Sequence, residues 1–489
     1  MSRRKAGLRS AAPSSIESGA MTQFKPARSH ETLGDAFFDR VTPADFPQTI
    51  LRHRDQRWAK RMGLDDLSDA QWVEHFARFA PLPGSIPTPL ALRYHGHQFR
   101  TYNADLGDGR GFLFAQGHDL VDDRLLDFGT KGSGRTPWSR GGDGRLTLKG
   151  GVREILATEM LEAQGVYASK SFSLVETGEA LQRGDEPSPT RGSVLVRLSH
   201  SHIRIGTFQR LAYLEDTESL ALLLDYANRT YYPDVSYETD KAAAFLGAVV
   251  ANVAKLGAQW IAAGFVHGVL NTDNINITGE SFDYGPWRFI PAYDPDFTAA
   301  YFDETGLYAF GRQPDTLAWN LTRLAESLLP LSSIEALEPA LNTVWPIFRE
   351  ELPRQILRRL GLKPRDVESD GAFVTELFGF LSASKAPYEQ FFFDWRGGSL
   401  SAERAAGSPS AALYASELFR SVANGLEHYG PADEVNLGHP YFARRSPRTM
   451  LIDEVEAIWA PIAEADDWSL FHATLAEIAE MRQAYGIEP

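Results

Sequence analysis

Two long stretches of this chain repeat apolar residues at the spacing of a helix, and two shorter stretches alternate apolar with polar residues. The helical spacing covers residues 148–163 and 241–263, and Gly165 follows the first stretch at the position where helices commonly stop. The alternation covers residues 171–177 and 193–199, which predicts two strands. The chain therefore combines long helices with a sheet.

The balance of these patterns changes along the chain. Residues 33–80 show a mixed, partly helical pattern, and residues 81–145 are rich in Gly with short periods, as is typical of strands and loops. Helical patterns dominate beyond Asp315, apart from a stretch at 404–410 that we expect to be flexible. A strand-containing half followed by a helical half predicts the α+β class and a protein of two lobes.

The composition is that of a globular protein with enough length for one large or two ordinary domains. Of the 489 residues, 43% are hydrophobic and 23% are charged. The net charge of −15 argues against nucleic acid as a partner, because binding to a phosphate backbone needs clustered positive charge. The chain has no cysteine, which excludes disulfides, zinc–thiolate sites and thiol catalysis and fits a reducing compartment.

No stretch has the pattern expected of a secretory signal or a membrane span. Residues 1–32 are basic and rich in Ser and Ala, and we expect a disordered leader there. The most apolar stretch, residues 242–270, contains Lys, Gln and His residues, which predicts a buried helix. We therefore expect a cytoplasmic protein that has no membrane partner, with a strand-containing region at 33–240 and a helical region at 241–489.

Residues 267–285 carry the most informative polar side chains. Oxygen-bearing side chains at Asn274 and Asp283, brought together by a short hairpin, suit a hard divalent ion that also binds phosphates. Asp273 beside them could accept a proton from a hydroxyl. Protein kinases use similar parts, but they place the catalytic base two residues after a His, where this chain has Val269. The alternative is that these residues only form turns, in which Asn and Asp are common.

Glycine and cationic residues are concentrated between residues 105 and 145. Glycine allows backbone N–H groups to approach an anion closely, and cationic side chains neutralise it. The cations here are Arg110, Lys131, Arg135, Arg140 and Arg145. An acidic protein that gathers positive charge in this way is expected to bind a polyphosphate, and the alternative is ordinary loops.

Further charged positions are expected to belong to the same site. Lys131 precedes Glu154 on the predicted helix, and kinases hold phosphates with such a strand Lys and helix Glu. The alternative is a weak surface pair. Arg197 lies in an apolar strand, so it needs an anionic partner, either substrate or a protein carboxylate. His200 and His202 lack a further His or Cys at ligand spacing, and we expect structural roles for them.

Taken together, these segments resemble the selenoprotein O family of kinase-like protein adenylyltransferases, here in a form without selenocysteine. The matches run in order along the chain and are specific as a set. They are Tyr94-His-Gly-His-Gln-Phe99, Leu106-Gly-Asp-Gly-Arg110, Lys131-Gly-Ser-Gly134, Thr136-Pro-Trp-Ser-Arg-Gly-Gly-Asp-Gly-Arg145, Arg153-Glu154, Ser201-His-Ile-Arg204 with Gly206, Gly264-Phe-Val-His-Gly-Val-Leu-Asn-Thr-Asp-Asn274, Asp283-Tyr-Gly-Pro286 and Trp319-Asn-Leu-Thr-Arg-Leu-Ala325.

The resemblance implies a kinase-like fold that binds ATP in the reverse orientation and transfers AMP to Ser, Thr or Tyr hydroxyls of proteins. It implies Mg²⁺ or Mn²⁺ as the cofactor and admits UTP as an alternative donor. Carried over by position, Asp273 would be the general base, and Asn274 and Asp283 the metal ligands. Lys131, supported by Glu154, would contact phosphate. The other nucleotide-binding positions would be Gly107, Gly109, Arg110, Asp143, Gly144, Arg197 and Arg204, together with Asp283.

The chain also departs from the family pattern. Arg100 stands where the family usually has Gly, Ser133 replaces Ala, Trp138 replaces Tyr, and Lys149-Gly-Gly151 replaces a Ser-rich helix start. These differences affect fine positioning more than chemistry. A regulatory disulfide cannot form, because the chain has no cysteine.

Two other functions use the same residues. The chain could be a kinase that transfers the γ-phosphate, against which Val269 argues. It could instead be a non-catalytic pseudokinase scaffold, against which the intact set of candidate metal ligands and cations argues.

Overall fold

A computed structural model describes residues 23–184, 186–236 and 240–487 of the chain. Within these ranges the centre is a nine-stranded sheet of order β2-β4-β7-β8-β11-β10-β3, with β1 beside β7 and β9 beside β11, all as antiparallel neighbours. The strands are β1 (Lys25–Ala27), β2 (Phe38–Arg40), β3 (Ile50–Arg54), β4 (Leu90–Leu92), β7 (Leu113–His118), β8 (Leu125–Lys131), β9 (Leu146–Thr147), β10 (Lys170–Leu181) and β11 (Thr190–Ser199).

Helices cover both faces of this sheet, which explains why β11 is buried along almost its whole length. Helix α3 (Leu148–Ala163) packs on one face, where Leu174 and Leu195 join its core. Helices α1 (Gln56–Arg61) and α2 (Asp69–Phe76) pack on the other face, where Trp72 stacks on Phe172 at 4.8 Å between ring centroids. Because side chains alternate along a strand, Arg197 points to the same face as Leu195, toward α3.

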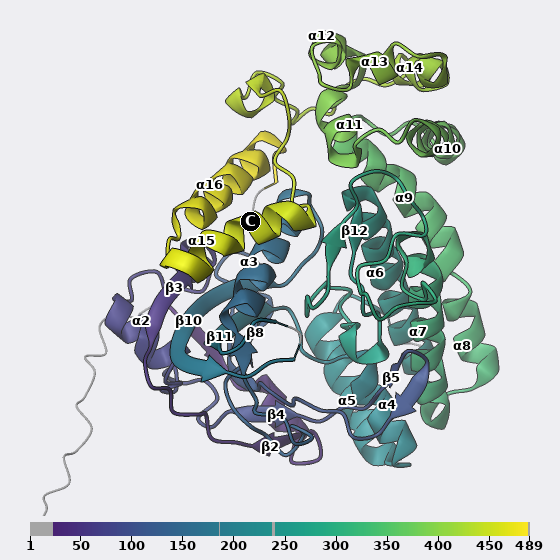
Figure 1. The fold of residues 1–489 in the computed structure, drawn as a ribbon. Coiled ribbons are helices and arrows are strands. Elements are labelled where there is room, and N and C mark those ends of the chain that lie inside the picture. The colour runs from purple at the N-terminus through teal and green to yellow at the C-terminus, as the bar shows by residue number, and fades with distance from the viewer. Residues whose placement is uncertain (1–22, 185, 237–239, 488–489) are drawn as a thin grey trace, which may run out of the picture.

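The helical side of the molecule is built around the long helix α6 (Lys241–Ala263) (Figure 1). The Asp240 side chain caps its first turn by accepting from Ala243 N, and Gly264 ends it in a left-handed conformation. Helices α5 (Thr217–Tyr231), α7 (Gln313–Leu328), α8 (Ile334–Leu341) and α9 (Val344–Leu360) surround it. Helix α4 (Ile205–Tyr213) contacts it through Phe208, whose ring stacks on Phe245 at 5.1 Å between centroids. Among the described residues, α6 alone is long and apolar enough to span a membrane, but 61% of its most apolar 18-residue stretch is buried in the protein.

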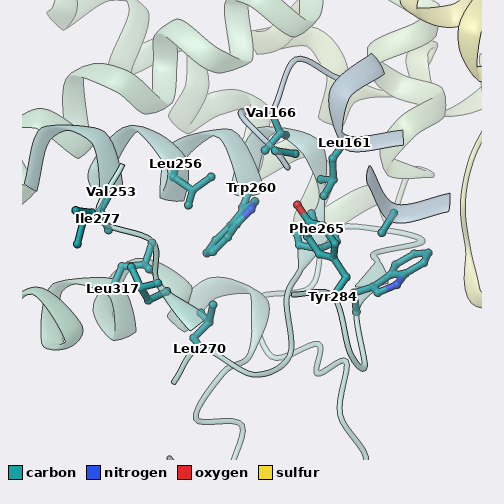
Figure 2. Packing of buried hydrophobic residues seen from close by; sticks show 14 of the residues in the cluster. Leu161, Val166, Val253, Leu256, Trp260, Phe265, Leu270, Ile277, Tyr284 and Leu317 are labelled. Carbon is teal, nitrogen blue, oxygen red and sulfur yellow. The ribbon is translucent and has the colours of Figure 1, made fainter. Parts of the chain in front are cut away.

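One hydrophobic core joins the sheet side to the helical side (Figure 2). Trp260 of α6 lies in it, together with Leu161 of α3 and Tyr284 from the segment that follows the predicted metal-binding residues. The indole Nε1 of Trp260 donates to Ser281 Oγ at 3.1 Å. The segment that carries Asp283 is therefore anchored to both halves of the protein.

The C-terminal region first extends the helical side and then returns to the sheet. It begins with α10 (Val367–Ser384), α11 (Tyr388–Asp394), α12 (Ala402–Ala406), α13 (Ala411–Tyr414) and α14 (Arg420–Leu426). Helices α15 (Ile452–Ala465) and α16 (Ser469–Ala484) then pack against α3 (Figure 1). The division of the molecule into a sheet side and a helical side therefore does not follow chain order.

Most predicted elements occur where the patterns placed them. The predicted helices at 148–163 and 241–263 are α3 and α6, and the two predicted strands are the cores of the longer β10 and β11. The stretch at 404–410, which we expect to be flexible, begins inside α12, and Arg404 donates to Arg396 O at 2.7 Å.

The predicted disordered leader needs a correction where the structure describes it. Residues 1–22 lie outside the described residues, but Lys25–Ala27 forms β1 against β7. Phe24 is buried, and its ring lies edge-on to Phe128 at 6.4 Å. Burial of this aromatic side chain offsets the entropy lost on ordering the segment.

Candidate active site

Side chains of α7 hold the loop that carries Asp273. After β12 (Phe265–Val266), which pairs with β13 (Arg288–Phe289), the chain reaches a short 3-10 helix, η2 (Thr272–Asn274). The Gln313 side chain donates to Phe265 O at 2.8 Å and accepts from His267 N at 3.0 Å. Asn320 donates to Leu270 O at 2.9 Å. These bonds fix the backbone of the loop before it reaches Asp273.

Asp283 lies on the segment that returns from this loop. Its φ is +65°, a left-handed conformation that Asp adopts more readily than most residues. The carbonyl of the preceding Phe282 bonds to His267 Nε2 at 2.9 Å, which ties the returning segment to the loop. The Asp-Tyr-Gly turn is thereby held in one place relative to Asp273.

Two cations of the sheet converge on the Asp283 carboxylate. Lys131 at the end of β8 donates to Oδ1 at 2.7 Å, and Arg197 of β11 donates to the same oxygen at 3.2 Å. The predicted pair of Lys131 with Glu154 on α3 is also present. Burial alone would raise the pKa of Asp283, but Lys131, Arg197 and Arg204 hold it well below its usual range. Asp283 is therefore ionised at neutral pH.

The Asp273 carboxylate is in a different environment. It is only 8% exposed, and its Oδ1 is buried with no hydrogen-bond donor among the described residues. Arg204 donates to the backbone carbonyl of Asp273 at 3.0 Å and leaves the carboxylate free. Burial raises the pKa of Asp273 to about 6, although Arg204 opposes the shift. An unshared carboxylate with this pKa suits a proton acceptor near neutral pH.

A small hairpin, β5 (Gly96–Gln98) with β6 (Thr101–Asn103), lies against the Asp273 loop (Figure 1). His97 N donates to Thr272 Oγ1 at 2.7 Å, and Thr272 Oγ1 donates to Gln209 Oε1 of α4 at 2.5 Å. Phe99 N donates to Asn271 Oδ1 at 3.2 Å. The hairpin, the loop and α4 therefore form one hydrogen-bonded unit.

A cavity of about 420 Å³ opens in front of these groups. Its described lining includes seven cationic side chains and four carboxylates, so an acidic protein presents excess positive charge at this place. These side chains are Arg110, Lys131, Arg140, Arg145, Arg183, Arg197, Arg204, Asp108, Asp143, Asp273 and Asp283. Gly107, Gly109 and Gly144 also line the cavity. The structure thus brings nearly all the predicted site residues to one cavity.

Three of the predicted residues lie outside this lining. Glu154 is fully buried behind Lys131. The Asn274 side chain donates to Val269 O at 2.9 Å, which directs its amide nitrogen into the loop. Arg135, which the sequence grouped with the phosphate-binding cations, is exposed and does not line the cavity.

The glycines of the cavity wall are needed for backbone packing as well as for access to an anion. A Cβ on Gly107 would lie 2.4 Å from Trp138 Cγ, and one on Gly144 would lie 2.2 Å from Gly134 O. Gly144 also has φ of +69°. Trp138, which departs from the family pattern, donates from Nε1 to Asp39 Oδ2 at 2.9 Å. The tryptophan therefore fixes the wall on which Gly107 lies.

Sequence reasoning missed several side chains of the cavity. Arg183, from the connection between β10 and β11, donates to both oxygens of Asp143 at 2.8 and 3.2 Å. Nothing in its Gly- and Pro-rich surroundings signals this role, and only the hairpin pairing of β10 with β11 brings it to the site. Tyr94 lies under the Arg204 guanidinium at 4.2 Å, and both residues belong to segments that the sequence did single out.

The predicted roles of the strand arginine and the two histidines agree with the observed contacts. Arg197 has a protein carboxylate, Asp283, as its anionic partner. His200 Nδ1 bonds to Tyr167 Oη at 2.8 Å, and His202 N donates to Asp127 Oδ2 at 3.0 Å. These histidines have structural hydrogen-bonding roles.

The side-chain oxygens of Asp283 and Asn274 fit a hard divalent cation. Asp283 Oδ2 accepts no hydrogen bond from the described residues. The Asn274 side chain bonds to Val269 O through its amide nitrogen, which leaves its carbonyl oxygen available. The described residues contain no group of three or more His, Cys, Asp or Glu side chains that could hold a metal. An ion such as Mg²⁺ would therefore depend on phosphate oxygens and water for its other ligands, as is common for this ion.

Comparison with known proteins identifies the family of the chain. A family model described as "Protein adenylyltransferase SelO" matches residues 20–479. A protein nucleotidyltransferase YdiU from Synechocystis is 46% identical over 461 residues, which cover 90% of this chain and 95% of the relative. A YdiU protein from Gloeobacter violaceus is 43% identical, over 97% of this chain and 98% of the relative. One from Trichormus variabilis is 42% identical, over 92% of this chain and 94% of the relative. The chain belongs to the SelO family of protein adenylyltransferases.

Proposed function

We propose that this protein transfers AMP from ATP to a Ser, Thr or Tyr hydroxyl of an acceptor protein, and that its two sides act as the lobes of a kinase-like fold. The observation that carries the proposal is the position of Asp273. It presents an unshared carboxylate to a cationic cavity, whereas Val269 occupies the place at which a kinase carries its base. Asp273 lies beside the candidate metal ligand Asn274, so the acceptor hydroxyl would meet the nucleotide close to the divalent metal ion.

The reaction is an in-line displacement at the α-phosphorus of ATP. The acceptor oxygen forms a bond to the α-phosphorus as the bond from that phosphorus to the bridging β-phosphate oxygen breaks, and diphosphate leaves. Asp273 takes the hydroxyl proton, because its carboxylate is unpaired and has a pKa of about 6. The acceptor hydroxyl must therefore enter next to Asp273.

The cations of the cavity position the triphosphate and stabilise the charge that develops during transfer. Lys131 and Arg197 already lie within 3.2 Å of Asp283, so they form a fixed positive wall beside it. Arg204 is buried between the rings of Tyr94 and Phe282, at 4.2 and 5.0 Å, which fixes its guanidinium. Groups fixed before the reaction do not have to be reorganised during it.

Asn274 and Asp283 would hold the divalent ion, which neutralises phosphate charge and orients the triphosphate when it is bound. The reverse orientation of ATP would place the α-phosphate on the side of Asp273. Asp143, Gly144 and Arg183 would then contact the opposite part of the nucleotide.

Two separate incubations test the proposed reaction. The protein is incubated with candidate acceptor proteins and Mg²⁺, once with ATP labelled at the α-phosphate and once with ATP labelled at the γ-phosphate. Label on protein from the α form alone is the expected result, and intact-mass spectrometry should show added AMP. Label from the γ form alone would show a kinase, and no binding of nucleotide would favour a scaffold.

A further inference from the structure

Three exposed aromatic side chains gather at one place on the surface. Phe99 is 37% exposed, Tyr301 is 87% exposed and Phe302 is 46% exposed. The ring centroids of Phe99 and Phe302 are 5.9 Å apart, and those of Tyr301 and Phe302 are 5.2 Å apart. We call these three residues the aromatic platform. Aromatic side chains grouped in solvent commonly mark an interaction surface.

The platform is attached to the loop that carries Asp273. Gln98 lines the nucleotide cavity, and the next residue, Phe99, donates from its backbone to Asn271 Oδ1 at 3.2 Å and to Tyr308 Oη at 3.1 Å. Tyr308 Oη donates to the same Asn271 oxygen at 2.7 Å. Asn271 precedes Asp273 by two residues, so the platform begins at the rim of the cavity, on the side of the base.

The loop that presents Tyr301 and Phe302 has a defined internal structure. The Asp303 carboxylate is buried and accepts from Leu307 N and Tyr308 N, both at 2.8 Å. Gly311 N donates to Pro295 O at 2.8 Å. The two aromatic side chains are thus held outward by a loop whose backbone is hydrogen bonded.

The same loop is acidic. Residues 289–311 contain four carboxylates and no Lys or Arg. Asp294, Asp296 and Glu304 are exposed and form no ion pair with a cation of the described chain. The neighbouring cations Arg312 and Lys385 donate instead to backbone carbonyls of the loop, at 3.1 Å to Thr305 O and 3.2 Å to Tyr293 O. This surface is opposite in charge to the adjoining cavity. It would therefore repel the nucleotide and attract a basic partner.

We propose that the aromatic platform and these three carboxylates bind an extended segment of the acceptor protein that carries an apolar side chain beside the modified hydroxyl and a Lys or Arg further along. The inference rests on the proposed function, because it assigns the acceptor to the side of Asp273. The apolar side chain packs on Tyr301 and Phe302, the basic side chain meets the acidic loop, and the hydroxyl then reaches the base.

Four synthetic peptides test the preference. Each contains one Ser, flanked by either Leu or Gly and followed by either Arg or Glu, and kcat/KM for label transfer is measured for each. The peptide with Leu and Arg should exceed the peptide with Gly and Glu by about tenfold or more, as for other interfaces with aromatic anchors. Equal rates for the four peptides, or no transfer to any of them, would overturn the proposal.

Surface variants then assign the preference to named residues. In the double variant Tyr301→Ser with Phe302→Ser, the advantage of peptides with Leu over those with Gly should be lost. In the triple variant Asp294→Asn, Asp296→Asn and Glu304→Gln, the advantage of peptides with Arg over those with Glu should be lost. ATP affinity should be unchanged in both. Val121→Ser is the matched control, since Val121 is an apolar side chain that is 73% exposed and does not line the cavity.

The outcomes separate this inference from the proposed reaction. The peptide preference can be measured with either α-labelled or γ-labelled ATP, so transfer of the γ-phosphate would overturn AMP transfer and still allow the docking surface to be tested. Unchanged peptide kinetics in the double variant would overturn the platform. If the double variant instead loses a dimer that sedimentation detects in the wild type, the occupant is a second copy and the proposal is wrong.

Discussion

Arg482 on the last helix, α16, donates to Glu159 on α3 at 2.9 Å, although 323 residues separate them. Its other terminal nitrogen donates to Glu162, also at 2.9 Å, and all three side chains are about nine-tenths buried. Helix α3 also carries Glu154, the partner of Lys131. Helix α16 therefore fixes the helix whose Glu154 pairs with Lys131, the lysine that we propose binds phosphate.

Replacement of Arg482 by Leu should destabilise the protein strongly. The change leaves Glu159 and Glu162 buried without this cation, and breaking a buried pair from one side costs about 3–5 kcal/mol. Because Arg57 also contacts Glu162, we expect a value near the lower limit. Urea denaturation measures the free energy of unfolding. Arg78→Ala, which removes an exposed pair with Glu74, should change it by less than about 1 kcal/mol.

The sequence could predict contacts that depend on local chemistry. Lys131 and Glu154 could be paired because kinases hold phosphates with a strand Lys and a helix Glu, and both elements were predicted here. Arg197 could be assigned an anionic partner because its strand is otherwise apolar, and a buried charge requires one.

The sequence could not predict contacts that depend on the return of distant segments. The bond from Arg482 to Glu159 requires that α16 pack on α3, and no periodicity specifies which apolar surface a helix will cover. Arg183 reaches Asp143 only because β10 and β11 pair over their whole length. The burial of Phe24 against Phe128, which orders part of the predicted leader, is likewise a tertiary contact.

Replacement of Asp273 by Asn should separate catalysis from binding. The variant keeps the backbone carbonyl that Arg204 contacts, so the loop and the cavity should persist. The rate of AMP transfer should fall by roughly 10²–10⁴, as for loss of a general base. Single-turnover transfer measures the rate, and calorimetry measures ATP affinity, which should be retained. Activity close to that of the wild type would exclude Asp273 as the base.

Replacement of Asp283 by Asn should remove the part of ATP binding that depends on the divalent ion. Asn tolerates the left-handed backbone at this position, so the fold should persist. Affinity for ATP with Mg²⁺ should fall by about tenfold or more, because the substitution removes the one negatively charged ligand that the protein would supply to the ion. Calorimetry with and without Mg²⁺ measures the difference. Asp123→Asn, which alters an exposed carboxylate away from the cavity, should leave both affinities unchanged.

Glu280 should make the stability of the protein depend on pH. Burial raises its pKa to about 7 from 4.5, although Lys170, a bond from His200 N and Arg124 oppose the shift. The folded state therefore binds this proton more tightly than the unfolded state. The stabilisation is complete below pH 4.5 and is lost as the pH rises through about 7.

Comparison with Glu280→Gln isolates this contribution, since the other titrating groups cancel in the difference. Relative to the variant, the wild type should lose up to about 3 kcal/mol of unfolding free energy between pH 4.5 and pH 8. Urea denaturation at these two pH values measures the change. A difference that does not vary with pH would show that Glu280 titrates normally in the folded protein.

Replacement of Gly206 by Ala should damage the site, although helix propensity favours alanine. Gly206 lies in the first turn of α4, where an added Cβ would be 2.1 Å from His95 O and 3.6 Å from Asp273 Cα. The backbone at His95 would have to move away, and with it the hairpin that contacts the Asp273 loop. We expect a loss of about 1–3 kcal/mol in unfolding free energy, as for other overpacked sites, and slower AMP transfer.

Gly371→Ala is the control for this substitution, because Gly371 lies inside α10 and a Cβ there meets nothing within 4 Å. That variant should gain about 0.5–1 kcal/mol of stability. Thermal or urea denaturation measures both variants, and the opposite signs test whether close packing against His95, and not helix propensity, requires glycine at 206. An equal gain in the two variants would mean that the hairpin can move without cost, and Asp273 would then lack the rigid support on which its proposed role as a base depends.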